Sequence, residues 1–144
     1  MMDERRLDLA PLESALSQFD LALSEYHAEP DRRAYRDSVA LHYMIVWNLL
    51  FQVIGRYLEQ QSVKPFEITD ASFQKIVRRA DALGLVRTGW PEFGRFKDAR
   101  NAIAHMYNQP KANMIVQAAP DFAAEAHFVL KILKERMSDA DDQD

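Results

Sequence analysis

The stretch from about Asp31 to Gln61 constrains the fold most, because its apolar residues repeat at helical spacing on two adjacent stripes. The two stripes consist of Val39, Tyr43, Val46, Leu50, Val53 and Tyr57, and of Met44, Trp47, Phe51, Ile54 and Leu58. Spacings of three and four residues place each set along one face of an α-helix. One neighbour cannot cover a face this wide, so this helix lies at the centre of a bundle or also lines a subunit interface.

The segments on either side show the same helical spacing. An amphipathic helix is predicted from Leu9 to Tyr26, with Asp8 as its N-cap, and another from Thr69 or Asp70 to a C-terminal Gly84. The loop between the second and third helices is expected at residues 62–70. A fourth helix is expected to follow the turn at Gly89, with Pro91 in its first turn, and a last helical segment carries Phe122, Ala126, Val129 and Leu133. Pro120 either separates this segment from residues 111–118 or kinks a single helix.

No strand pattern, internal repeat or glycine-rich phosphate loop is present in the sequence. The predicted fold is therefore all-α, an antiparallel up-and-down bundle of four to five helices that is expected to form a dimer. The 144 residues suit one helical domain, residues 1–137. Residues 138–144, with four aspartates in seven positions, are expected to form a disordered acidic tail.

Several classes of protein are disfavoured by composition. The chain has no cysteine, which excludes a disulfide framework, a thiolate nucleophile and a cysteine-based metal site. The N-terminal residues lack the order of a signal peptide, and the apolar run from Ala40 to Ile54 is too short to span a bilayer. We therefore expect a cytoplasmic protein without a membrane partner.

Basic residues gather in the middle of an otherwise acidic chain of net charge −4. Between Lys75 and Arg100 there are seven bases and three acids, whereas the first thirty-one residues hold eight acids and two arginines. A locally positive region suits a ligand that bears phosphate, and Arg78, Arg79, Arg95 and Lys97 are the candidate RNA-binding residues. The alternative is a solvated basic face without a ligand.

Two polar rows interrupt the stretch from Arg95 to Asn108 when it is treated as one helix. Phe93, Phe96, Ile103 and Tyr107 then share an apolar stripe with Arg100, while Asp98, Asn101, His105 and Asn108 form a polar stripe beside it. An arginine on a core-facing stripe costs several kcal/mol, roughly, unless a partner meets it. One explanation is a buried polar cluster that serves only the fold, with Arg100 bound to Asp98 or a carbonyl and His105 to an asparagine.

The other explanation is chemistry on RNA. Histidine transfers protons near neutral pH, and arginine holds a phosphate and the charge that develops at phosphorus. His105 would remove the proton of a 2′-hydroxyl and Arg100 would stabilise the pentacoordinate phosphorus. Asn101 would orient His105 or the phosphate, and Tyr107 would supply a hydroxyl. On a straight helix Arg100 and His105 point about 140° apart. They converge if the helix is distorted after Arg100, if the arginine wraps around, or if a second copy packs across a two-fold axis.

The pattern Arg100-x-x-x-x-His105-x-Tyr107, with Asn101 after the arginine, resembles the signature of HEPN (higher eukaryotes and prokaryotes nucleotide-binding) domains. The resemblance is closest to the branch encoded beside minimal nucleotidyltransferases. It extends from Val39 to Met137 and includes Tyr43-x-x-x-Trp47, the run Ala82-Leu83-Gly84-Leu85-Val86, and Trp90.

This resemblance implies a helical homodimer that pairs with a minimal nucleotidyltransferase as toxin and antitoxin. The HEPN member would be a metal-independent RNase without a cofactor, in which Arg100 and His105 are catalytic and Asn101 supports them. The partner would silence it, in some cases by adenylylating Tyr107. The alternative in the same branch is a non-catalytic subunit that binds a nucleotide substrate for the transferase.

Overall fold

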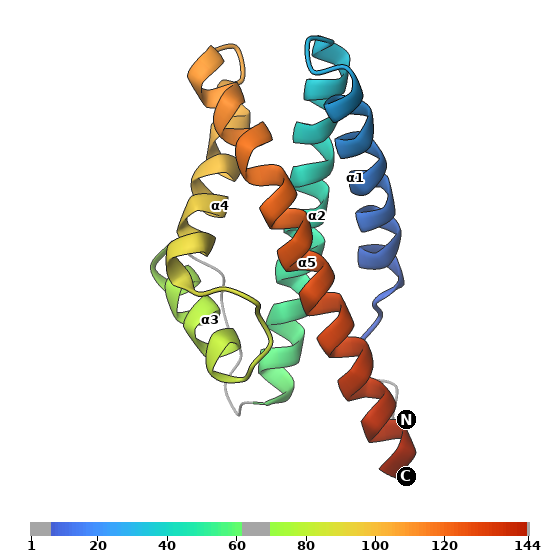
Figure 1. The fold of residues 1–144 in the computed structure, drawn as a ribbon. Coiled ribbons are helices and arrows are strands. Elements are labelled where there is room, and N and C mark those ends of the chain that lie inside the picture. Colours follow the sequence, from blue (N-terminus) through green and yellow to red (C-terminus); the bar gives the residue numbers. More distant parts are fainter. Residues whose placement is uncertain (1–6, 62–69, 144) are drawn as a thin grey trace.

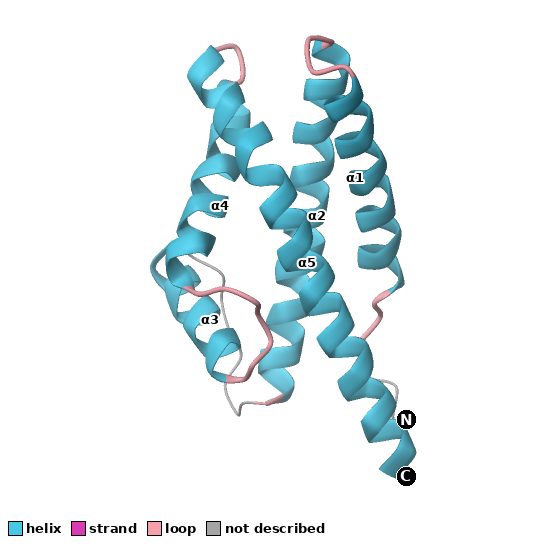
Figure 2. Cartoon of the chain, viewed as in Figure 1, coloured by secondary structure: helices cyan, strands magenta, loops and turns pink. Residues whose placement is uncertain are grey.

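The computed structural model describes residues 7–61 and 70–143, which form five α-helices. These are α1 (Ala10–Ala28), α2 (Arg33–Gln60), α3 (Asp70–Ala82), α4 (Trp90–Ala102) and α5 (Gln109–Gln143). A short 3₁₀ helix, Ile103–His105, lies between α4 and α5, and the described residues contain no strand (Figure 2). The predicted all-α bundle is confirmed. The predicted loop before α3, together with a cap at Thr69, lies outside the described residues.

Helix α2 forms the centre of the bundle and contacts all four other α-helices. Figure 1 shows α1 along one side of it, α3 and α4 on the other, and α5 crossing in front. Most residues of both apolar stripes are buried within the single chain, so the central position explains the wide apolar face. By length and composition alone α2 could also cross a membrane, which the sequence argument did not anticipate. More than half of its most apolar window is buried inside the bundle, 56%, as expected for a core helix.

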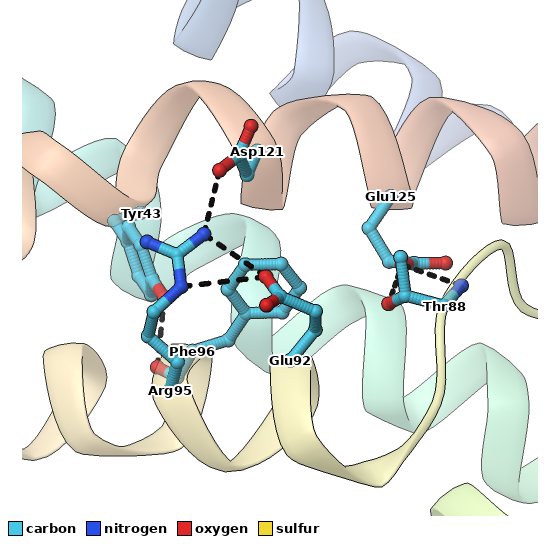
Figure 3. Close-up of polar contacts among 7 residues, drawn as sticks. All are labelled: Tyr43, Thr88, Glu92, Arg95, Phe96, Asp121 and Glu125. Atoms are coloured by element: carbon cyan, nitrogen blue, oxygen red, sulfur yellow. Dashed lines mark hydrogen bonds and ion pairs between the residues drawn. The ribbon is translucent and has the colours of Figure 1, made fainter.

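An aromatic cluster joins α2 to α4 and α5. The ring of Tyr43 stacks on Phe122 with centroids 4.4 Å apart, and Phe96 packs on Phe122 at 5.5 Å. The hydroxyl of Tyr43 donates a hydrogen bond of 2.7 Å to the carbonyl oxygen of Phe96 (Figure 3). Burial raises the pKa of Tyr43, so the phenol stays neutral and remains a donor. This bond sets the register between α2 and α4.

Helix α3 ends where the sequence predicts, at a glycine, whereas α5 continues through a proline and through the expected tail. Gly84 follows α3 with φ of +70°, as predicted for a C-terminal glycine, and the Leu85 amide donates to the Ala80 carbonyl at 2.9 Å. Pro120 lies inside α5, which is one continuous helix, and Ala119 and Phe122 beside it are fully buried. Packing on both sides of the proline offsets the single backbone hydrogen bond that it removes. The helix continues through residues 138–143, where the sequence predicts a disordered tail, because each added residue needs only one further backbone bond.

Candidate functional site

The motif lies on a turn at one end of the bundle. Helix α4 ends at Ala102, a 3₁₀ helix occupies Ile103–His105, and α5 begins at Gln109 (Figure 1). The expectation of one α-helix through Asn108 is therefore wrong. The side chain of Asn108 accepts a hydrogen bond of 3.3 Å from the Lys111 amide, and its own amide donates to the His105 carbonyl at 3.0 Å. Asn108 thus helps to close the turn that reverses the chain.

The motif side chains face solvent or stand without partners. Tyr107 is 88% exposed, so its predicted place on the apolar stripe is wrong, because the stripe ends where α4 ends. Asn101 and His105 are exposed, and the imidazole lies 6.1 Å from the Tyr107 ring, centre to centre. Arg100 is half-buried, and its guanidinium makes no hydrogen bond or ion pair in the described part of the chain.

These positions contradict the explanation by a buried polar cluster. That cluster requires Arg100 to bind Asp98 or a carbonyl, and His105 to bind an asparagine. Neither bond is present among residues 7–61 and 70–143, and Asp98, Asn101 and His105 are all exposed. Asp98, Arg100, Asn101 and His105 are therefore not held in place by one another for the sake of the fold.

An open pocket of about 300 Å³ brings several of these groups together. It is lined by Asp98, Asn101, Ala102, His105, Lys111 and Met114. Three members of the predicted polar stripe thus meet in one place, but Arg100 is not part of this lining. Lys111 adds a positive charge that the sequence argument missed, because the turn carries the first residues of α5 back beside α4. Pro110, which suits the first turn of a helix, was the only signal for this arrangement.

The four basic candidates for RNA binding have different environments. Arg95 forms ion pairs with Glu92 at 3.1 Å and with Asp121 of α5 at 2.6 Å (Figure 3). Burial lowers the pKa of Arg95, but the bonds to the two carboxylates raise it more, so the net shift is upward. Lys97 lies over the Phe73 ring at 5.4 Å, and Arg78 and Arg79 are exposed on α3. Two carboxylates therefore compensate the charge of Arg95, which weakens the case for Arg95 as an RNA-binding residue.

Glu125 on α5 holds the loop from which α4 starts. Its side chain is fully buried and accepts a hydrogen bond from the Arg87 amide. It also accepts hydrogen bonds from the Thr88 amide and the Thr88 hydroxyl (Figure 3). Through this loop Glu125 positions α4, whose far end carries the motif. The sequence argument missed Glu125, although an acid three residues after Phe122 and four before Val129 falls on the apolar face of its helix. Within the described residues, no group of three or more His, Asp or Glu side chains is placed to hold a metal ion.

The fold places this chain among the helical-bundle proteins. A family model described as nucleotidyltransferase substrate binding protein like matches residues 7–135, and the chain belongs to that family. It is also similar to HI0074 from Haemophilus influenzae, whose structure is described as the fold of a substrate binding domain of a nucleotidyltransferase. The TM-score is 0.75 at 22% identity, over 88% of this chain and 99% of that one, which shows a shared fold.

A curated relative is the probable ribonuclease HepT of Haemophilus influenzae, strain ATCC 51907 / DSM 11121 / KW20 / Rd. It is 30% identical over 91 residues, which cover 63% of this chain and 62% of the relative. The chain thus spans less than two thirds of that relative's length.

Proposed function

We propose that this protein is a metal-independent endoribonuclease of the HEPN type, the toxin of a pair with a minimal nucleotidyltransferase. The observation that carries the proposal is the state of Arg100 and His105. Both belong to the motif, both reach solvent, and neither has a polar partner in the part of the chain that the structure describes. Residues with no role in the fold are expected to serve a ligand. The name of the HepT relative and the motif support RNA as that ligand.

In the proposed reaction His105 removes the proton from a ribose 2′-hydroxyl. The 2′ oxygen then bonds to the adjacent phosphorus while the bond from phosphorus to the 5′ oxygen breaks. The 5′ oxygen takes a proton from solvent water and leaves as a 5′-hydroxyl, and His105 returns its proton to the solvent. The other product is a 2′,3′-cyclic phosphate. Arg100 offsets the negative charge on the pentacoordinate phosphorus, and Asn101 and Lys111 bind the RNA strand in the pocket beside His105. No step requires a metal.

A homodimer accounts for the separation of Arg100 from the pocket that holds His105. The proposed site combines the arginine of one copy with the histidine of the other across a two-fold axis. Sedimentation at micromolar concentration is expected to give twice the chain mass of 16.6 kDa. If sedimentation instead gives the mass of one chain, the protein is a monomer and the composite site is ruled out.

The proposed partner is a small nucleotidyltransferase that acts as the antitoxin in the cytoplasm. The family description supports a nucleotidyltransferase partner. Tyr107, which is 88% exposed beside His105, offers an accessible hydroxyl as the acceptor of a nucleotide from that enzyme. Adenylylation there would add negative charge next to the proposed base and oppose the approach of RNA.

A second candidate function is that of a non-catalytic subunit that binds a nucleotide for the transferase, which the family description favours. Incubation of the pure protein with single-stranded RNA in excess EDTA separates the two functions. The RNase is expected to yield fragments with 2′,3′-cyclic phosphate and 5′-hydroxyl ends. Intact RNA, together with saturable binding of ATP, would instead support the substrate-binding subunit.

A further inference from the structure

A second arginine with few polar partners is Arg36, in the first turns of α2. Its Nε atom is buried and has no hydrogen-bond partner, the one such side-chain atom among the part-buried and buried residues that the structure describes. Its Nη2 atom reaches only the adjacent Asp37, at 3.4 Å, and its side chain is 17% exposed. A buried donor without a partner is costly, and a native structure that keeps one calls for an explanation.

The register of α2 and α4 places Arg36 and Arg100 at the same end of the bundle. The bond from the Tyr43 hydroxyl to the Phe96 carbonyl fixes the level at which these antiparallel helices meet (Figures 1 and 3). Arg36 precedes Tyr43 by about 10 Å along α2, and Arg100 follows Phe96 by about 6 Å along α4. The two arginines therefore differ by about 4 Å in height, less than the length of either side chain.

The helical directions point both arginines into the space between α2 and α4. Arg36 lies about 20° around α2 from Tyr43, and Arg100 lies about 40° around α4 from Phe96. Tyr43 and Phe96 are both fully buried at the contact between the two helices. By this geometry the two side chains start from facing helices at the end of the bundle where the motif turn lies, the upper end of Figure 1.

The electrostatics of this pair differ from those of Arg95. Arg95 bridges two carboxylates, whereas Arg100 has none and Arg36 has only its exposed sequence neighbour. Two guanidinium groups that face one another repel unless an anion lies between them. Two forks of N–H donors that converge on one point match the oxygens of a phosphate.

We propose that Arg36 and Arg100 together bind one phosphate group, with Arg36 as a phosphate-binding residue that transfers no proton. The inference rests on the proposed function in one respect, namely that the bound phosphate belongs to RNA. A nucleotide bound for a transferase would present the same chemistry, so the test compares RNA with ATP.

The test measures the affinity of the full chain for a fluorescent 2′-O-methyl oligoribonucleotide, which cannot be cleaved by its own 2′ oxygen. Arg36→Gln is expected to weaken binding about tenfold, the typical effect of losing a charge-assisted hydrogen bond. Arg56→Gln is the matched control, because Arg56 is exposed on the same helix, about 200° around its axis and near its other end. It removes the same charge and is expected to change the affinity less than twofold.

A double variant tests whether both arginines hold the same phosphate. If they do, Arg36→Gln and Arg100→Gln combined lose less affinity than the product of the single effects, below about thirtyfold rather than a hundredfold. Fully multiplicative losses would place the two side chains on separate groups and overturn the shared site.

Folding is checked by thermal melts, in which Arg36→Gln should melt no lower than the parent, because the lost Nε has no partner. If Arg36→Gln does melt lower, Arg36→Lys is measured instead. Lysine keeps the positive charge but lacks the forked N–H donors of the guanidinium, and a threefold or greater loss of affinity is expected for this variant. An Arg36 variant that binds as the Arg56 control does overturns the inference. So does a parent protein that binds neither the oligonucleotide nor ATP. A protein that binds ATP through Arg36 but leaves unmodified RNA intact upholds the phosphate site and refutes the RNase.

Discussion

Replacement of Glu125 by alanine is expected to loosen the start of α4 and destabilise the protein. Its carboxylate accepts three hydrogen bonds from Arg87 and Thr88 and is fully buried. The alanine variant leaves donors without partners, each costing about 1–3 kcal/mol when buried. Because Arg87 itself is exposed, water can reach part of this loop, and we expect the free energy of unfolding to fall by about 2–4 kcal/mol.

Urea unfolding followed by circular dichroism measures this change, with Glu135→Ala as the control. Glu135 is an exposed acid on the same helix, so its removal should alter the free energy of unfolding by less than about 0.5 kcal/mol. Hydrogen exchange gives a local measure, since the amides of Arg87 and Thr88 should exchange at least tenfold faster in Glu125→Ala. An alanine variant as stable as the control, with unchanged exchange at both amides, would refute the structural role of this carboxylate.

Three further variants test the roles proposed for other residues. Arg95→Gln should lower the free energy of unfolding by only about 1 kcal/mol, because its ion pairs are well exposed. It should also leave the affinity for RNA within twofold of the parent. A tenfold loss of affinity would show that Arg95 binds RNA despite its two carboxylate partners. Reversal of Arg78 and Arg79 to glutamate should weaken RNA binding and make it less dependent on salt, while the helical content stays constant. Unchanged affinity would mean that these two arginines lie on a solvated face that binds no RNA. Tyr107→Phe should fold and still cleave RNA, yet mass spectrometry should detect no nucleotide on it after incubation with the partner and ATP; a modified variant would exclude Tyr107 as the acceptor.

The helical core could be predicted from the sequence because its cause is local and periodic. Apolar spacing in α2 identifies a central helix without knowledge of its neighbours. Gly84 marks the end of α3 because a positive φ strains residues that carry a Cβ atom. The motif residues could be named from spacing and resemblance for a similar reason, since short motifs are contiguous in the chain.

The geometry of the site could not be predicted, because it depends on residues far apart in sequence. Nothing within residues 103–108 marks the end of α4 at Ala102, where the chain turns back and α5 packs against α4. Charge counting placed Arg95 with the RNA-binding residues, but it cannot see Asp121, twenty-six positions away on α5. The sequence left open whether Pro120 separates two helices or kinks one, and α5 is a single helix through it.

The central claim is that Arg100 and His105 are retained for chemistry and not for folding. The most direct test measures RNA cleavage in EDTA and the melting temperature on the same preparations of the parent, Arg100→Ala and His105→Ala. Because neither side chain has a polar partner among the described residues, both variants should melt within about 2 °C of the parent. His105→Ala should lose at least about 100-fold in cleavage rate, the lower range for a general base, and Arg100→Ala should lose a comparable factor. Folded variants that cleave RNA at the parental rate would contradict the claim.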